Sequence, residues 1–249
     1  MIVSYYCCHW YVSIQTEQEV AAPSHPKTDL VGMDMGVARF ATCSDGKVIK
    51  AKNHFKRLSR KLKIAQRSLS RKEKFSSNWK KQRERIQKLH ARIANARKDY
   101  LHWHSNRLSQ NHATIVMEDL QVKNMSKSAK GTLEEPGKNV RAKSGLNRAI
   151  LDQGWGEFKR QLKYKLEWLG GELLLVDPKY TSQTCPSCQH VAKENRQSQA
   201  DFHCVACGYH ENADLVGAMN VCRAGHAHLA CGDTASVSLG AQESTRVAA

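Results

Sequence analysis

The chain has 249 residues and a formal net charge of +16, because 39 lysines and arginines outnumber 23 acidic residues. Its hydrophobic fraction of 41% is ordinary for a folded protein and argues against wholesale disorder. No apolar run approaches the roughly 20 residues that a bilayer span requires, so no membrane partner is expected. A positive excess of this size favours polyanionic partners, and the composition therefore predicts a protein that binds nucleic acid.

The nine cysteines indicate a reducing compartment. Their number is odd and four of them form two C-x-x-C pairs, a usage that favours metal binding over a disulfide framework. We therefore expect a cytoplasmic protein.

The first 50 residues predict short strands. The apolar opening "MIVSYYCCHWYVSI" has no basic start and is interrupted by Ser, His and Cys, so we interpret it as a strand and not as a signal peptide. The segment that follows, up to residue 29, has two prolines and is expected to be a linker. Residues 30–50 alternate apolar and polar around a Ser-Asp-Gly turn, which predicts strands near 30–34, 37–43 and 47–50.

Residues 54–110 carry a helical pattern, most simply an antiparallel hairpin with its turn near 74–78. Its expected apolar seam consists of Leu58, Leu62, Ala65, Leu69, Phe75, Trp79, Gln82, Ile86, Leu89, Ile93, Ala96, Tyr100 and Trp103. Between Lys50 and Lys98 there are 19 lysines or arginines and two acids, Glu73 and Glu84. So many positive charges on one surface repel one another unless a polyanion lies along it. The pattern therefore favours contact with nucleic acid over a face that is only solvated.

The remaining elements alternate between strand and helix. Residues 113–122 predict a buried strand, 127–145 a mobile basic loop, 147–169 an amphipathic helix, the segment "GGELLLVDP" a short strand, and 213–223 a helix before a small, polar tail. With no internal repeat visible, the order predicts an α/β core with large insertions.

Four cysteines have the spacing of a zinc site. Cys185, Cys188, Cys204 and Cys207 follow the pattern C-x2-C-x15-C-x2-C, which forms two knuckles around one tetrahedral Zn²⁺ with no position left for water. Such a ribbon buries little apolar area, so the structural metal is expected to supply its folding energy. Cys222 and Cys231 lie outside the pattern and are expected to be free or buried thiols.

Three carboxylates occupy unusual positions. Asp34 lies inside an apolar strand and Glu118 ends another, where an unpartnered acid is costly to bury. Asp214 stands at the start of an otherwise apolar helix. Taken singly, Asp34 could have a salt-bridge partner and Asp214 could be a first-turn acid. Together in a basic protein, the three suggest ligands for two Mg²⁺ ions that hydrolyse a phosphodiester. Asp119 is left out, because neighbouring residues of a strand point to opposite faces.

The segments "VGMDMGVARFAT", "IVMEDLQVKNM" and "TSQTCPSCQHV…FHCVACGYHENADLVGAMNV" resemble the three parts of a RuvC-type nuclease interrupted by a zinc ribbon, the arrangement of the TnpB (OrfB-type transposase) family. The resemblance runs from about residue 9 to 232. It implies an RNase H-like core, RNA-guided DNA cleavage, a guide RNA and DNA as partners, and a bacterial or archaeal, nucleoid-associated location. The catalytic trio of the family would fall on Asp34, Glu118 and Asp214.

The resemblance also implies a domain plan, listed here by residue ranges: 1–29 as the terminal strand of a missing N-terminal domain plus linker, 30–180 as the RuvC-like core with the hairpin of about 54–110 inserted, 181–212 as the zinc ribbon, 213–224 as the last core helix and 225–249 as a tail. Two features depart from the family. Val216 stands where an Asn is common, and family members carry more than a hundred further residues before the "WYVSI" strand. We therefore expect an N-terminally truncated member of the family, of unknown oligomeric state.

Two other functions stay open at this point. A non-catalytic DNA- or RNA-binding zinc protein that regulates transposition would need only the ribbon and the basic hairpin. A strand-transferring transposase would use a similar two-metal site and would be expected to bring an end-recognition domain. The carboxylate trio favours the nuclease over the binder, since a binder has no use for it.

Overall fold

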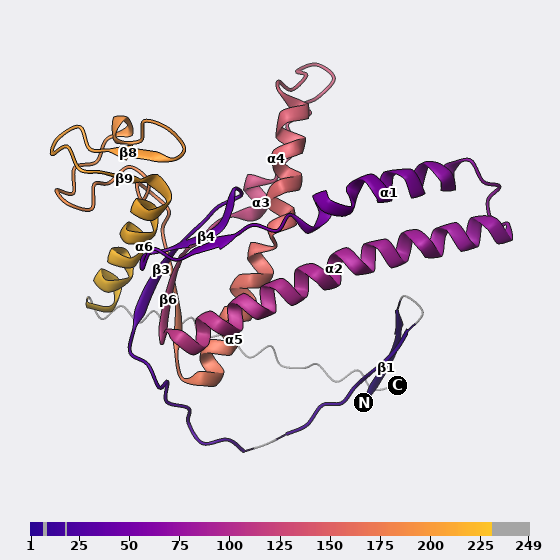
Figure 1. The fold of residues 1–249 in the computed structure, drawn as a ribbon, viewed down its shortest axis with the longest axis horizontal. Helices are drawn as coiled ribbons and strands as arrows, with labels where there is room; N and C mark the ends of the chain where they lie inside the picture. Colours follow the sequence, from indigo (N-terminus) through magenta and orange to yellow (C-terminus); the bar gives the residue numbers. More distant parts are fainter. Residues whose placement is uncertain (7–8, 18, 231–249) are drawn as a thin grey trace.

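A mixed five-stranded sheet lies at the centre of the computed structural model, which describes residues 1–6, 9–17 and 19–230 (Figure 1). Its strands are β3 (Leu30–Met35), β4 (Arg39–Cys43), β5 (Val48–Lys50), β6 (Thr114–Glu118) and β7 (Glu172–Val176). Their order is β5-β4-β3-β6-β7; β3 is antiparallel to β4, and β6 is parallel to both β3 and β7. The prediction of a mixed α/β fold is confirmed.

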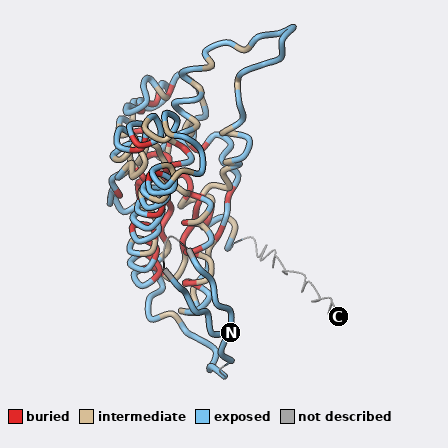
Figure 2. Tube along the Cα trace, turned by 90° about the vertical axis from the view of Figure 1, so that its right-hand side faces the viewer, coloured by how far each residue is buried: buried red, intermediate tan, exposed pale blue. Residues whose placement is uncertain are grey.

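The two central strands are apolar on both faces because helices cover both sides of the sheet. On one face, Met33 and Ile115 pack with Phe158 of α5 (Trp155–Leu169), all of them fully buried. On the other face, Val116 packs with Val221 of α6 (Ala213–Ala230). Red in Figure 2 marks this buried centre.

Two glycines let helix α6 approach the central strands closely. A Cβ atom on Gly32 of β3 would lie 2.4 Å from the carbonyl oxygen of Ala218 and 2.4 Å from the amide nitrogen of Cys222. Gly225 makes a similar approach to Val116, where an added Cβ would lie 2.3 Å from Cγ2. Only glycine fits at either position, so the distance between α6 and the central strands is set by these two residues.

A long arm of two antiparallel helices, α1 (His54–Ser70) and α2 (Ser77–Asn111), connects β5 to β6 and extends away from the sheet (Figure 1). The prediction of two helices is confirmed, but the seam is narrower than expected, because Phe75 and Trp103 are 73% and 56% exposed. At the base of the arm, the buried carboxylate of Asp152 accepts the backbone N–H of Phe55 and forms a 2.6 Å ion pair with Arg97.

Three sequence expectations about elements are wrong. The helix expected over 147–169 is two helices, α4 (Val140–Gln153) and α5, separated at Gly154. The φ of Gly154 is 75°, a left-handed conformation that interrupts an α-helix. The basic loop therefore ends at residue 139. The strand expected over 113–122 stops at Glu118 and is followed by the short helix α3 (Val122–Met125). In addition, α6 continues to Ala230, beyond the expected limit of 223–224.

The N-terminal region is a two-stranded antiparallel hairpin, β1 (Ile2–Tyr6) and β2 (His9–Ser13), where a single strand was expected. Residues 231–249, which include Cys231 and most of the expected tail, lie outside the described residues. None of the helices in the described part of the chain is long and apolar enough to cross a membrane.

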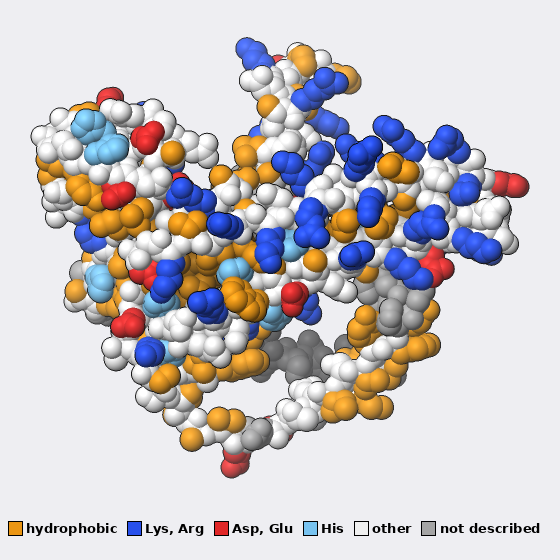
Figure 3. Space-filling model, in the orientation of Figure 1, with side chains coloured by type: hydrophobic (Ala, Val, Ile, Leu, Met, Phe, Trp, Pro, Cys, Tyr) orange, Lys and Arg blue, Asp and Glu red, His pale blue; other side chains and the backbone are white. Residues whose placement is uncertain are grey.

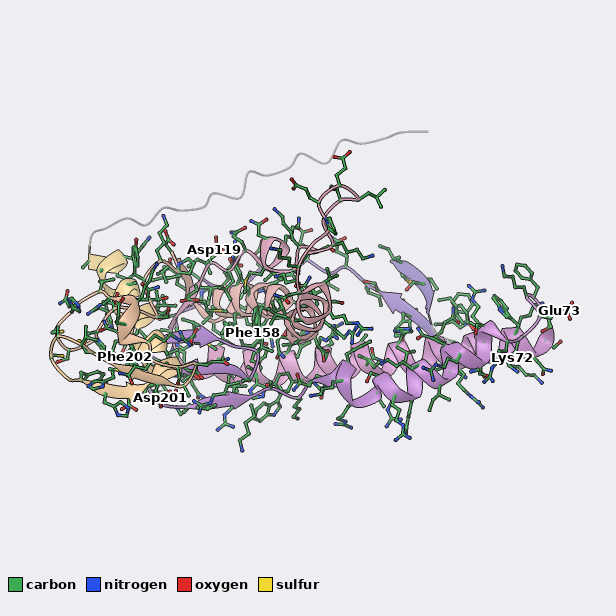
Figure 4. All side chains as sticks on the ribbon, turned by 90° about the horizontal axis from the view of Figure 1, so that it is seen from above. Lys72, Glu73, Asp119, Phe158, Asp201 and Phe202 are labelled. Atoms are coloured by element: carbon green, nitrogen blue, oxygen red, sulfur yellow. The ribbon has the colours of Figure 1, made fainter. Side chains whose placement is uncertain are left out.

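Between β7 and α6 the chain forms a small knuckled unit with one 3-10 turn, Lys193–Asn195, and the strand pair β8 (Asp201–His203) and β9 (His210–Asn212). It lies at the opposite end of the molecule from the tip of the arm. In Figure 4, Asp201 and Phe202 mark this unit, and Lys72 and Glu73 mark the tip. Its own core is small and consists of Phe202, Ala213, Val216 and two of the cysteines.

Candidate carboxylate and cysteine sites

Strand register places Asp34 and Glu118 side by side. In the parallel pair β3–β6, Gly32 lies opposite Val116 and Met33 opposite Met117, so Asp34 and Glu118 are the next pair in the same register. Asp34 shares the strand face of Gly32, and Glu118 shares that of Val116. Both carboxylates therefore lie on the face covered by α6.

Asp214 reaches this face from the first turn of α6. The side-chain oxygen of Asn212 accepts the backbone N–H of Asp214 at 3.2 Å and a hydrogen bond from Arg39 of β4 at 3.1 Å. The Arg39 guanidinium also lies 3.6 Å from the Asp214 carboxylate. Asn212 and Arg39 thus fix the start of α6, and the half-exposed Arg39 stands beside Asp214.

The negative charges of the other two carboxylates act on Asp34. Burial, together with the charges of Glu118 and Asp214, raises the pKa of Asp34 to about 7, and the positive charge of Arg196 opposes the shift. Burial also raises the pKa of Glu118. A carboxylate cluster with so few compensating cations is unfavourable in the metal-free protein. Hard oxygen ligands held together at this cost fit a divalent cation such as Mg²⁺.

The side chain of Glu118 has a partner outside the sheet. The hydroxyl of Thr181 donates a 2.6 Å hydrogen bond to its Oε1 atom. Asp119, the next residue, turns the other way and forms a 2.8 Å ion pair with Lys159 of α5, as expected for the opposite face. Asp119 is therefore separated from the cluster.

The four predicted cysteines form a compact cluster. Their Sγ atoms all lie within 4.8 Å of one another, with 3.6 Å between Cys185 and Cys207 and 3.5 Å between Cys188 and Cys204. A tetrahedron with Zn–S bonds of about 2.3 Å requires S–S edges of about 3.8 Å, so the quartet fits the geometry of a zinc site. Cys222, by contrast, is a free, half-buried thiol on α6.

Among the described residues, the cysteine quartet is the one group of three or more metal-ligating side chains this tight. Asp34, Glu118 and Asp214 do not form a group of this kind. A two-metal site does not require one, because its ions lie about 3.5–4 Å apart and the ligands are distributed between them.

Sequence reasoning missed three residues of the carboxylate site: Thr181, Arg39 and Arg196. Each is an ordinary polar residue of a loop or strand, and nothing in its neighbours along the chain distinguishes it. Thr181 matters because it contacts Glu118, which is 63 residues away in the chain. Arg39 matters because it contacts Asp214, which is 175 residues away.

Positive charge gathers on the arm. Figure 3 shows Lys and Arg side chains along α1 and α2, with few acidic side chains among them. Lys81, Arg85 and Arg92 line one cavity of about 340 Å³ on α2. Nearer the sheet, the exposed ring of Trp103 has the guanidinium of Arg107 5.4 Å from its centroid. The arm therefore offers both cations and exposed aromatic rings, such as that of Trp103, to a polyanion.

Comparisons with known proteins agree with these features. Residues 13–129 match the family model OrfB_IS605, described as probable transposase, and residues 155–221 match the Cas12f1-like TNB domain. Over 231 residues the chain is 59% identical to "Putative RNA-guided DNA endonuclease InsQ" of Escherichia coli (strain K12), covering 93% of this chain and 58% of that protein. It is 36% identical over 225 residues to a protein of Streptomyces pristinaespiralis with a corresponding name, covering 90% and 52%.

Similarity extends to CRISPR-associated nucleases. The chain is 27% identical over 229 residues to the endodeoxyribonuclease Cas12f1 of Sulfoacidibacillus thermotolerans, covering 85% of this chain and 49% of that protein. A solved Cas12f1–sgRNA–target DNA complex aligns at 21% identity with a TM-score of 0.49, covering 88% of this chain and 55% of the other. The chain spans about half the length of the curated relatives it matches.

These matches place the chain among proteins that combine a transposase-type region with a Cas12f1-like TNB domain, and the cysteine quartet lies within the latter. It belongs to the TnpB (OrfB-type transposase) family, as the motifs around Asp34, Glu118 and Asp214 indicated.

Proposed function

We propose that this chain carries the nuclease part of an RNA-guided, metal-dependent DNA endonuclease associated with a transposon. In this proposal the five-stranded sheet with α5 and α6 is an RNase H-like core, and the arm of α1 and α2 is an insertion in it. The observation that carries the proposal is the convergence of Asp34, Glu118 and Asp214 on one face of the sheet, at an electrostatic cost visible in the raised pKa of Asp34.

Asp34, Glu118 and Asp214 would hold two Mg²⁺ ions, which would supply an activated water and stabilise the leaving oxygen of a phosphodiester. Arg39 and Arg196 carry positive charge beside this cluster, so they favour approach of the phosphodiester to it. The cysteine quartet would hold one structural Zn²⁺, and the ribbon around it fixes the start of α6 and hence Asp214. Lysines and arginines of the arm would contact the backbones of DNA and of a guide RNA.

The alternative, a non-catalytic nucleic-acid binder, does not explain the carboxylate cluster. A binder gains nothing from an acid whose pKa is raised to about 7 by its burial and by two neighbouring acids, and the cluster would repel a nucleic acid in the absence of metal. The cost is explained if a divalent cation occupies the cluster.

The test is cleavage by three single variants, Asp34→Ala, Glu118→Ala and Asp214→Ala. Each should lose Mg²⁺-dependent cleavage of DNA by more than about 100-fold, since even the loss of a residue that only orients a metal ligand typically costs about 10–100-fold. Binding of DNA or RNA should stay within a few-fold of the wild type, because the arm is distant from the cluster. If a variant cleaves normally, its residue does not belong to the site; if all three do, cleavage does not use the carboxylate cluster.

A further inference from the structure

We propose that Thr181 is a positioning residue for Glu118, and that Asn220 of α6 locks Thr181 in place. The first turn of the ribbon, residues 181–184, would then orient a carboxylate that the ribbon does not itself contain. This inference rests on the proposed function, because it gives Thr181 a role only if Glu118 binds a metal ion.

The first step is the contact between Thr181 and Glu118. Thr181 is 8% exposed, and its Oγ1 atom lies 2.6 Å from Glu118 Oε1 and 3.0 Å from the carbonyl oxygen of Pro178. A hydroxyl has one proton to donate, and the shorter distance is typical of a charge-assisted O–H···O⁻ bond. The proton is therefore assigned to Glu118. With Oε1 occupied in this way, Oε2 is the oxygen left free to bind a cation.

The second step is the attachment of this turn to α6. Asn220 is 5% exposed, and its single amide nitrogen donates to the carbonyl oxygens of Thr181 at 2.8 Å and of Thr184 at 2.7 Å. Both N–H bonds of the amide are thus used on one turn of the ribbon. The same helix supplies Asp214. Helix α6 therefore positions Asp214 directly and Glu118 through Thr181.

The third step links the turn to the cysteine cluster. Cys185 follows Thr184 directly, and its backbone N–H donates to the carbonyl oxygen of His190 within the first knuckle. The knuckle, the turn and α6 form one hydrogen-bonded unit that ends at the Glu118 carboxylate. Without the Thr181 hydroxyl, that carboxylate could rotate about its side chain, and a divalent cation would have to order it on binding.

The experiment measures Mn²⁺ binding by the zinc-loaded full chain, followed by electron paramagnetic resonance or calorimetry. Thr181→Val keeps the shape and removes the hydroxyl, Thr181→Ala removes it with less bulk, and Thr181→Ser retains it. The matched control is Thr184→Val, because the Thr184 hydroxyl bonds only to the carbonyl oxygen of Tyr180 in its own turn. We expect Thr181→Val and Thr181→Ala to weaken Mn²⁺ binding by about 10–100-fold, with Thr181→Ser and Thr184→Val within about threefold of wild type.

Two further measurements distinguish a failure of the role of Thr181 from a failure of the proposed function. Glu118→Ala establishes whether the bound Mn²⁺ depends on the carboxylate site at all; unchanged binding in Glu118→Ala would defeat the proposed function itself. If Glu118→Ala abolishes binding while Thr181→Val and Thr181→Ala retain it, only the role of Thr181 fails. Zinc content and thermal melting report on folding, and loss of zinc from both Thr181→Val and Thr181→Ala would make Thr181 a folding residue and overturn the proposal.

Discussion

The ribbon and the arm lie at opposite ends of the sheet and are stabilised by different physical means (Figures 1 and 4). The ribbon has a core of a few side chains and contacts the carboxylate site through short hydrogen bonds, such as that from Thr181 to Glu118. The arm has a helical seam and many cations, and it is clamped at its base by Asp152. The difference indicates that a change in the ribbon should reach the carboxylates, whereas a change in the arm should alter binding alone.

The largest expected effect is that of removing zinc from the ribbon. Structural zinc contributes on the order of 10 kcal/mol to small domains of this kind, so a chelator or Cys185→Ser should unfold the ribbon and displace Asp214. We expect loss of cleavage together with loss of hydrogen-exchange protection in residues 181–212, while α1 and α2 stay protected. A metal-free protein with unchanged melting and activity would contradict the distinction between ribbon and arm.

Neutralising the arm should have the next largest effect, on binding only. The triple variant Lys81→Ala, Arg85→Ala and Arg92→Ala removes three cations of one cavity of α2. The slope of log K against log salt should become shallower by about 2–3, since each phosphate contact contributes about 0.7–0.9. Titrations at several salt concentrations measure this slope, with Asp34→Ala as the control that keeps it. An unchanged slope in the triple variant would assign nucleic-acid contact to another surface.

Asp34→Asn should stabilise the protein in the absence of Mg²⁺. Because the pKa of Asp34 is raised from 3.8 to about 7, the folded state binds its proton more tightly than the unfolded state does. Stability is therefore lost as the pH rises from about 4 to 7, and the loss is complete above pH 7. The asparagine variant avoids a cost of about 2–4 kcal/mol at pH 8 and gains little at pH 4.

Urea unfolding of the zinc-loaded protein at the two pH values measures this gain. A variant as stable as the wild type at pH 8 would mean that the three acids are less crowded than the structure indicates.

The smallest effect concerns the exposed ring of Trp103 on the arm. Stacking of an unpaired base on an aromatic ring contributes about 1–3 kcal/mol, so Trp103→Ala should weaken binding of single-stranded DNA or RNA by about 5–100-fold. Trp168→Ala is the matched control, because Trp168 on α5 is exposed at least as much as Trp103 but stands next to the acidic Glu167. Equal effects of the two substitutions would remove any special role for Trp103.

Much of this arrangement could be predicted from sequence, because the strongest signals are local. The cysteine spacing predicted the cluster of four thiols. Asp34 was conspicuous because an acid inside an apolar strand is costly to bury. The apolar period predicted the two helices of the arm. The interruption at Gly154 was missed because the helical period continues in phase across it, and a single glycine in a helix costs only about 1 kcal/mol.

Contacts between distant segments could not be predicted in this way. Thr181 and Arg39 look ordinary in sequence, and their significance depends on which strand or helix folds against them. Likewise, Trp103 fits the apolar seam of α2 by spacing, but the partner helix α1 begins at His54, and α2 also packs against α5. Only the tertiary structure decides which ring stays accessible.

Because Gly32 has no side chain, α6 can lie against β3, and this close approach sets the spacing of the carboxylates. A single added carbon at residue 32 would press on the helix backbone at Ala218 and Cys222. Ala218 follows Gly217, at which an added Cβ would lie 3.1 Å from the Asp34 carboxylate. The helix would have to lift from the sheet and carry Asp214 with it. A substitution that alters no charge and no side-chain hydrogen bond would in this way separate Asp34 from Asp214, so the spacing of the three carboxylates depends on the smallest residue of β3.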